Sequence, residues 1–70
     1  GHLAVRQVQD WLYVESDEEV SQVVLYAANG QLVATGPGTR LEVASLPKGI
    51  YIARILFHDG RTAHQSFIKK

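Results

Sequence analysis

The chain of 70 residues contains no cysteine, so no disulfide can reinforce it. A chain of this length forms one domain and buries about 60% of the surface that its unfolded form exposes. So small a core leaves little stability to offset a strained catalytic pocket when neither a disulfide nor a metal supports it. The missing cysteine therefore argues against an enzyme, while the cytoplasm and an exported location both stay open.

An excess of charge is absent as well, because 7 basic and 7 acidic side chains cancel. Proteins that bind nucleic acid, and modules that dock on anionic membranes, carry clusters of Lys and Arg. The balanced charge removes the electrostatic signature of both classes. We therefore predict no nucleic-acid partner.

No apolar run approaches the ~20 residues of a membrane-spanning helix, and no charged-then-apolar signal peptide opens the chain. Gly1 and His2 resemble residues left by a cloning site. We therefore interpret residues 1–70 as one terminal domain whose signal peptide lies upstream.

Apolar residues, mainly Val, Ile, Leu and Tyr, come in runs of about 4 to 8 separated by turn dipeptides. No window shows a helical period. The pattern predicts an all-β domain with strands over residues 3–8, 11–15, 20–27, 31–35, 39–44, 50–57 and 61–68.

Two dipeptides, Asn29-Gly30 and Asp59-Gly60, predict two-residue type I′ hairpins. Residues 35–39 and 45–49 are looser connections, where chains in sandwiches cross from one sheet to the other. We therefore predict an immunoglobulin-like antiparallel β-sandwich. Its expected core is Leu12, Val14, Val23, Leu25, Leu41, Val43, Leu46, Tyr51 and Ile55.

Arg54 sets the predicted facing of the last hairpin. A two-residue turn at Asp59-Gly60 pairs Ile52 with Phe67. A guanidinium is costly in a dry core, so Arg54 and its same-face neighbours should point outward. Apolar clusters seldom stay exposed without a partner. We therefore predict a contact patch of Ile52, Arg54, Leu56 and Phe67, with Tyr51, Ala53, Ile55 and Phe57 facing inward.

No metal or catalytic site is predicted. His2, His58 and His64 lack the spacing of metal ligands. The acidic run at residues 17–19 lacks the alternating oxygen ligands of a calcium loop, so it reads as a solvated turn. We expect no cofactor and no enzymatic activity.

Three segments follow one another in an informative order: Val-Ser-Gln-Val-Val-Leu-Tyr at 20–26, Asn-Gly-Gln-Leu-Val at 29–33 and Leu-Pro-Lys-Gly-Ile-Tyr-Ile-Ala-Arg at 46–54. From about Trp11 to Lys70 the chain resembles the C-terminal sorting domain of the type IX secretion system, also called the Por secretion system. That family has a Leu-Pro-x-Gly-Ile-Tyr segment and a Lys-bearing final strand. The resemblance implies a recognition motif of Leu46, Pro47, Gly49, Ile50, Tyr51, Lys69 and Lys70.

The resemblance implies a passive export signal, which guides its protein from the periplasm across the outer membrane to the cell surface or the medium. The implied partners are the type IX translocon and the surface sortase and attachment machinery, with anionic lipopolysaccharide involved indirectly. The family usually opens with Tyr-Pro-Asn-Pro, whereas residues 6–10 here are Arg-Gln-Val-Gln-Asp. Release of the domain by cleavage and its retention on a machinery component therefore both stay open.

Three further interpretations concern binding. Trp11 and Tyr13 alternate with apolar residues, so an alternative function is a structural or carbohydrate-binding module with an aromatic platform.

Tyr51 resembles the corner tyrosine of sandwiches, whose hydroxyl bonds nearby backbone, although receptor contact is the alternative. An isolated domain with unpaired sheet edges is also prone to form homodimers or exchange strands.

Overall fold

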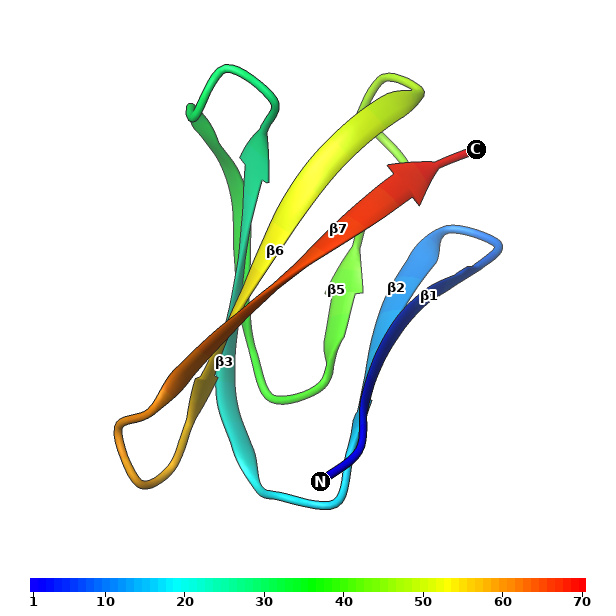
Figure 1. The fold of residues 1–70 in the computed structure, drawn as a ribbon. Helices are drawn as coiled ribbons and strands as arrows, with labels where there is room; N and C mark the ends of the chain where they lie inside the picture. Colours follow the sequence, from blue (N-terminus) through cyan, green and yellow to red (C-terminus); the bar gives the residue numbers. More distant parts are fainter.

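The computed structural model describes residues 1–70 and contains seven β-strands and no helix that could cross a membrane (Figure 1). The predicted all-β class is confirmed, with strand ends displaced by at most two residues. The strands are β1 (Leu3–Val8), β2 (Trp11–Ser16), β3 (Val20–Ala27), β4 (Leu32–Pro37), β5 (Arg40–Glu42), β6 (Gly49–Phe57) and β7 (Thr62–Lys69).

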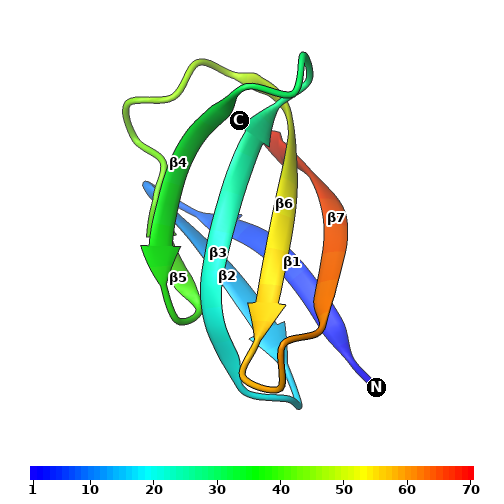
Figure 2. The same ribbon diagram turned by 90° about the vertical axis from the view of Figure 1, so that its left-hand side faces the viewer.

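The strands form two antiparallel sheets. Sheet A has the order β1-β2-β5, and sheet B has the order β4-β3-β6-β7. The chain crosses between the sheets after β2, after β4 and after β5, and the last two crossings lie where turn chemistry predicts them. Figure 2 shows sheet B in front of sheet A, so the two sheets are the layers of the predicted β-sandwich.

The core lies between the sheets and consists of side chains that alternate along each strand. Of the nine predicted core residues, all are buried except Leu46, which packs partly buried against the others. The inward side of β6 is also as predicted. The buried set is Leu12, Val14, Val20, Val23, Leu25, Leu41, Val43, Tyr51, Ala53, Ile55, Phe57 and Phe67.

The β6–β7 turn is longer than the predicted type I′ hairpin. The Phe57 N–H donates to the Arg61 carbonyl (2.9 Å), and the Gly60 N–H donates to the Phe57 carbonyl (3.0 Å). Residues 58–60 therefore form a three-residue loop, in which Gly60 adopts a φ of 91° that favours glycine. The β3–β4 turn repeats these bonds between Ala27, Gly30 and Gln31, so both type I′ predictions are wrong.

The longer turn shifts the β6–β7 register by one residue. Tyr51 lies opposite Phe67, where a two-residue turn would have placed Ile68. Because side chains alternate with period two, this shift moves every side chain of β7 to the other face of sheet B. Phe67 is buried, with its ring centroid 6.3 Å from that of Tyr51. Its assignment to the outer contact patch is therefore wrong.

Candidate recognition surface

The predicted motif begins in the connection between β5 and β6, which closes one end of the sandwich (Figure 1). We call residues 43–48 the crossing segment. Its only backbone–backbone hydrogen bond within the segment is a turn in which the Leu46 N–H donates to the Val43 carbonyl at 3.1 Å. Other carbonyls of the segment have no strand partner, so side chains or water must satisfy them.

Tyr51 holds the crossing segment from the core side. Its ring is buried, and its hydroxyl donates a hydrogen bond of 2.5 Å to the Pro47 carbonyl. The predicted bond of this corner tyrosine to nearby backbone is confirmed. Since the hydroxyl is engaged and the ring is covered, Tyr51 shapes the motif from within.

Lys69 holds the same segment from the edge strand. It lies opposite Gly49 in the β6–β7 ladder, so β7 extends one residue beyond the predicted end at Ile68. Its Nζ donates to the Leu46 carbonyl at 2.9 Å and approaches the Ala44 carbonyl at 3.4 Å. The fold therefore brings Lys69 beside Ala44 and Leu46, which lie more than 20 residues away in the sequence.

Gly49 supplies a backbone conformation that other residues disfavour. Its φ is 150°, and a Cβ added there would have no neighbour within 4 Å. Conformation, not space, therefore makes glycine the suitable residue at the start of β6.

Ile50 is the motif residue that lies exposed on the outer side of sheet B. It forms a direct cross-strand pair with Ile68, and the two are 59% and 63% exposed. On the same face Ile52 pairs with Tyr26, which pairs in turn with Leu32 (55% exposed). We call these five residues the outer apolar face of sheet B. Sequence reasoning missed Tyr26, Leu32 and Ile68. Placing Leu32 and Ile68 required the true hairpin registers, whereas alternation from the predicted core residue Leu25 could have placed Tyr26 outward.

Arg54 lies further along the same face. It is exposed, faces His64 across the ladder and takes part in none of the four ion pairs of the structure. Leu56 lies two residues on and is half-buried. Arg54 and His64 also line a shallow hollow with Tyr26 and Ile52. Three of the four predicted patch residues thus share this face, without Phe67.

Lys70 is fixed differently from Lys69. Its backbone N–H donates to Gln7 Oε1 at 2.9 Å, and Gln7 Nε2 donates to its carbonyl at 3.4 Å. Gln7 belongs to β1, so these bonds tie the end of sheet B to sheet A. The Lys70 residue itself is exposed.

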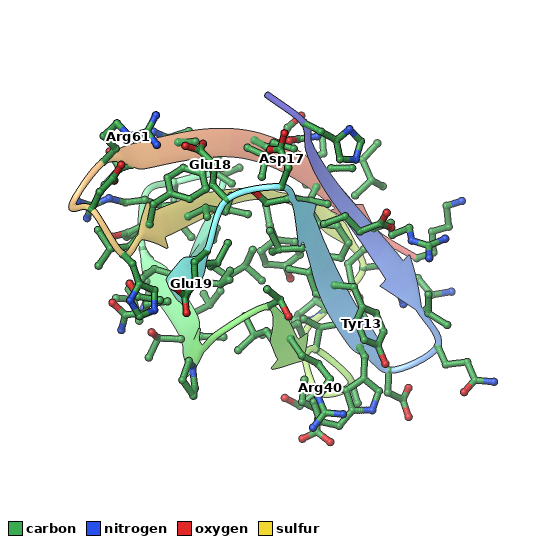
Figure 3. The ribbon with its side chains drawn as sticks, turned by 90° about the horizontal axis from the view of Figure 1, so that it is seen from below. Tyr13, Asp17, Glu18, Glu19, Arg40 and Arg61 are labelled. Atoms are coloured by element: carbon green, nitrogen blue, oxygen red, sulfur yellow. The ribbon has the colours of Figure 1, made fainter.

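The opposite end of the sandwich carries the acidic run. Figure 3 shows Glu18 beside Arg61, with which it forms an ion pair, and Arg61 Nε also bonds Asp59 Oδ2 at 2.7 Å. Hydrogen bonds from the backbone and side chain of Arg61 hold the pKa of Asp59 below its usual value. No three His, Asp or Glu side chains are grouped in a way that could hold a metal ion.

The aromatic pair on the outer side of sheet A does not form an open platform. The Arg40 guanidinium stacks over the Trp11 ring, with Cζ 4.5 Å from its centroid. Arg40 is also the ladder partner of Tyr13, beside which it lies in Figure 3. A sugar would have to displace this cation–π contact to stack on the indole.

The profile of the family described as secretion system C-terminal sorting domain matches residues 8–70. No curated protein and no solved structure matches the chain significantly. The matched residues include the crossing segment, Ile50 and both terminal lysines. The family is not an enzymatic one, and its match does not favour the carbohydrate-binding alternative. The predicted resemblance is thus confirmed, and the chain belongs to the family of C-terminal sorting domains, the sorting signals of type IX secretion.

Proposed function

We propose that the type IX machinery recognises this sorting domain through two neighbouring surfaces. One is the outer apolar face of sheet B, and the other is the end of the sandwich that carries the crossing segment, which we call the motif end. Recognition directs the protein that carries the domain from the periplasm across the outer membrane, to the cell surface or the medium. The translocon and the surface attachment machinery, which includes the sortase, are the partners. Anionic lipopolysaccharide enters only through the attachment step.

The exposure of the Ile50–Ile68 pair is the observation that carries this proposal. Fully burying one Ile side chain stabilises a complex by about 1.5–3 kcal/mol, and more than half of each residue is still exposed. Apolar patches of this kind mark interaction sites on soluble domains. Ile50 also lies inside the segment that the family shares.

The charges around this face indicate the chemistry of the partner. Arg54 has no carboxylate partner, and the exposed Lys48 and Lys70 lie at the motif end. A partner surface that is apolar and bears carboxylates would complement both features. Such charges mainly raise the rate of association and fix its orientation.

The test fuses the chain to a periplasm-competent reporter in a type IX-proficient cell and measures surface display. We expect the double change Ile50→Ser and Ile68→Ser to lower display about tenfold or more, since it removes the centre of the apolar contact. Val8→Ser is the matched control, because Val8 is also exposed (44%) but lies in sheet A. Circular dichroism checks that each variant stays folded.

Display of the double variant at the level of the intact domain would contradict the proposed surface. If the intact domain itself directs no display, a Tyr-Pro-Asn-Pro segment placed ahead of Val8 is the control for the missing family prolines. Failure of that version as well would overturn export as the function of this chain.

A second candidate, retention of the domain on a component of the machinery, is favoured by the structure of residues 6–10. Arg6, Gln7 and Val8 pair with β2 as part of β1, and Arg6 Nε bonds Glu15 Oε1 at 2.5 Å. A segment built into a sheet is a poor substrate for cleavage, which requires an extended and accessible chain. Mass spectrometry of the surface protein decides, because retention leaves the domain attached and release removes it.

We also propose that the isolated domain self-associates. The outer apolar face is not covered by the chain, and the edge strands β4 and β7 have no strand paired to their outer edges. Sedimentation velocity over a range of concentrations tests this. A single monomeric species at the highest concentration would contradict it.

A further inference from the structure

Two adjacent lysines stand at the end of β7: Lys69 is its last residue, and Lys70 follows directly after the strand. Phe67 is buried on the inner side, so alternation places Lys69 on that same side, with Ile68 facing outward between them. The crossing segment passes over this end of the sheet, within reach of the Lys69 ammonium. Lys69 is accordingly half-buried, whereas Lys70 is exposed.

The crossing segment is held at two consecutive carbonyls. Tyr51 donates to the carbonyl of Pro47, and Lys69 donates to that of Leu46. An ammonium group has three donors and no acceptor, so one Lys can bond Leu46 and approach Ala44 at the same time. Hydrogen bonds from a charged donor are roughly twice as strong as neutral ones. Lys69 therefore supplies a cross-link from the last strand to the family motif.

The same geometry connects Lys69 to the displayed isoleucines. Its ladder partner Gly49 immediately precedes Ile50, and Lys69 itself immediately follows Ile68. Movement of the crossing segment would be passed to Ile50 through a single residue, Gly49. The residue that bonds Leu46 thus lies one ladder position from the exposed pair.

We propose that Lys69 is a positioning residue of the sorting signal: it fixes the crossing segment so that Ile50 and Ile68 are presented together, and it does not contact the machinery. This inference rests on the proposed function. It assigns the terminal lysines different roles, since only Lys70 has a side chain free to meet a partner.

Amide hydrogen exchange of the folded chain tests the geometry without any partner. Lys69→Met keeps an unbranched side chain but removes the donors, and Lys70→Met is the matched neighbour. We expect Lys69→Met to speed exchange of the Leu46 N–H, whose turn the lysine braces, about tenfold. Lys69→Arg should restore much of the protection, and Lys70→Met should leave it unchanged.

Surface display of the reporter fusion tests the role in recognition. We expect Lys69→Met to lower display and Lys69→Arg to recover it. Ile55→Val lowers the stability of the core without touching the crossing segment, so it controls for a purely structural effect. It should leave both display and Leu46 exchange close to those of the intact chain.

Unchanged Leu46 exchange in Lys69→Met would overturn the inference, as would faster exchange with undiminished display. Reduced display with unchanged exchange would show direct contact by Lys69 and overturn it too. Loss of display in Ile55→Val equal to that in Lys69→Met would reduce Lys69 to a structural residue. If the intact domain directs no display, the proposed function fails, while exchange still decides whether Lys69 holds the segment.

Discussion

The two ends of the sandwich are closed by different chemistry. At the motif end, Tyr51 and Lys69 donate to backbone carbonyls of a segment that has almost no backbone partner of its own. At the opposite end, Arg61 joins Glu18 of the β2–β3 loop to Asp59 of the β6–β7 turn, and all three side chains are exposed. Exposed ion pairs are screened by salt and depend on pH, whereas partly buried hydrogen bonds to carbonyls are far less sensitive.

The end that carries the family motif is therefore also the end whose shape depends least on salt and pH. Under the proposed function, the domain passes from the periplasm to the outside and therefore meets changes in ionic strength and pH. Loss of the Arg61 pairs would loosen two loops outside the motif. Loss of the Tyr51 or Lys69 bonds would move the motif itself.

The largest effect should come from the core on which both ends rest. Phe67→Ala removes a buried ring and should lower the free energy of unfolding by about 3–5 kcal/mol, because it leaves a cavity between the sheets. Ile68→Ala, one residue away but 63% exposed, should change it by less than about 0.5 kcal/mol. Urea denaturation of both variants provides the measurement. Equal losses would contradict the observed facing of β7.

Tyr51→Phe tests the motif end at its inner contact. Removing the hydroxyl leaves the Pro47 carbonyl without its donor and should cost about 1–2 kcal/mol, measured by thermal or urea unfolding. The loss should be nearly the same at low and high salt. Tyr13→Phe is the matched control, since the Tyr13 hydroxyl takes part in none of the side-chain hydrogen bonds of the structure. A comparable loss in the control would show that the Pro47 bond is not the cause.

Arg61→Gln tests the opposite end, where the expected effect is smaller and depends on salt. It removes both ion pairs and should lower the melting temperature slightly in dilute buffer. At about 1 M NaCl, where the Debye length is near 3 Å, most of the difference from the intact chain should vanish. A difference that persists in full at high salt would assign the stability to packing of Arg61 on the Phe57 ring.

Asp59→Asn gives the smallest expected effect and isolates the charge. The pKa of Asp59 is lowered in the folded state, first by the Arg61 backbone N–H and then by its guanidinium. A carboxyl with a lowered folded pKa stabilises the fold above its unfolded pKa of about 3.9, and this contribution disappears as the pH falls through the folded value. The variant can still cap the Arg61 N–H but has no charge. Its melting temperature should lie below that of the intact chain at pH 7, and the two should converge as the pH falls below the folded pKa of Asp59. A gap that is independent of pH would contradict this assignment.

Strand positions and most of the core were predictable because alternation of apolar residues is a local signal. The facing of β7 was not, since Asp59-Gly60 suits a two-residue type I′ turn and equally the end of the three-residue loop that forms. One residue of loop length reverses all side chains of the strand, and neither His58 nor Arg61 specifies that length.

Lys69 shows why part of the site escaped prediction. A lysine near the end of a chain resembles a frayed, solvated residue. Its partners at Leu46 and Ala44 become neighbours only when the crossing segment passes over the end of sheet B. That approach depends on packing of the two sheets, which no local pattern encodes. Resemblance to the family indicated the residues of the motif, but not which of them face inward.

The two-point attachment of the crossing segment also bears on proteolysis. Lys48 is an exposed lysine in a connection, which is where trypsin-like enzymes usually cut. Cleavage needs the chain on both sides of the bond to leave the fold and extend into the enzyme. Here the preceding carbonyls are held by Tyr51 and Lys69, and the following Gly49 is paired in the ladder. The bond after Lys48 should therefore be cut only as often as the segment detaches, which makes the nicking rate a direct measure of how often the motif opens.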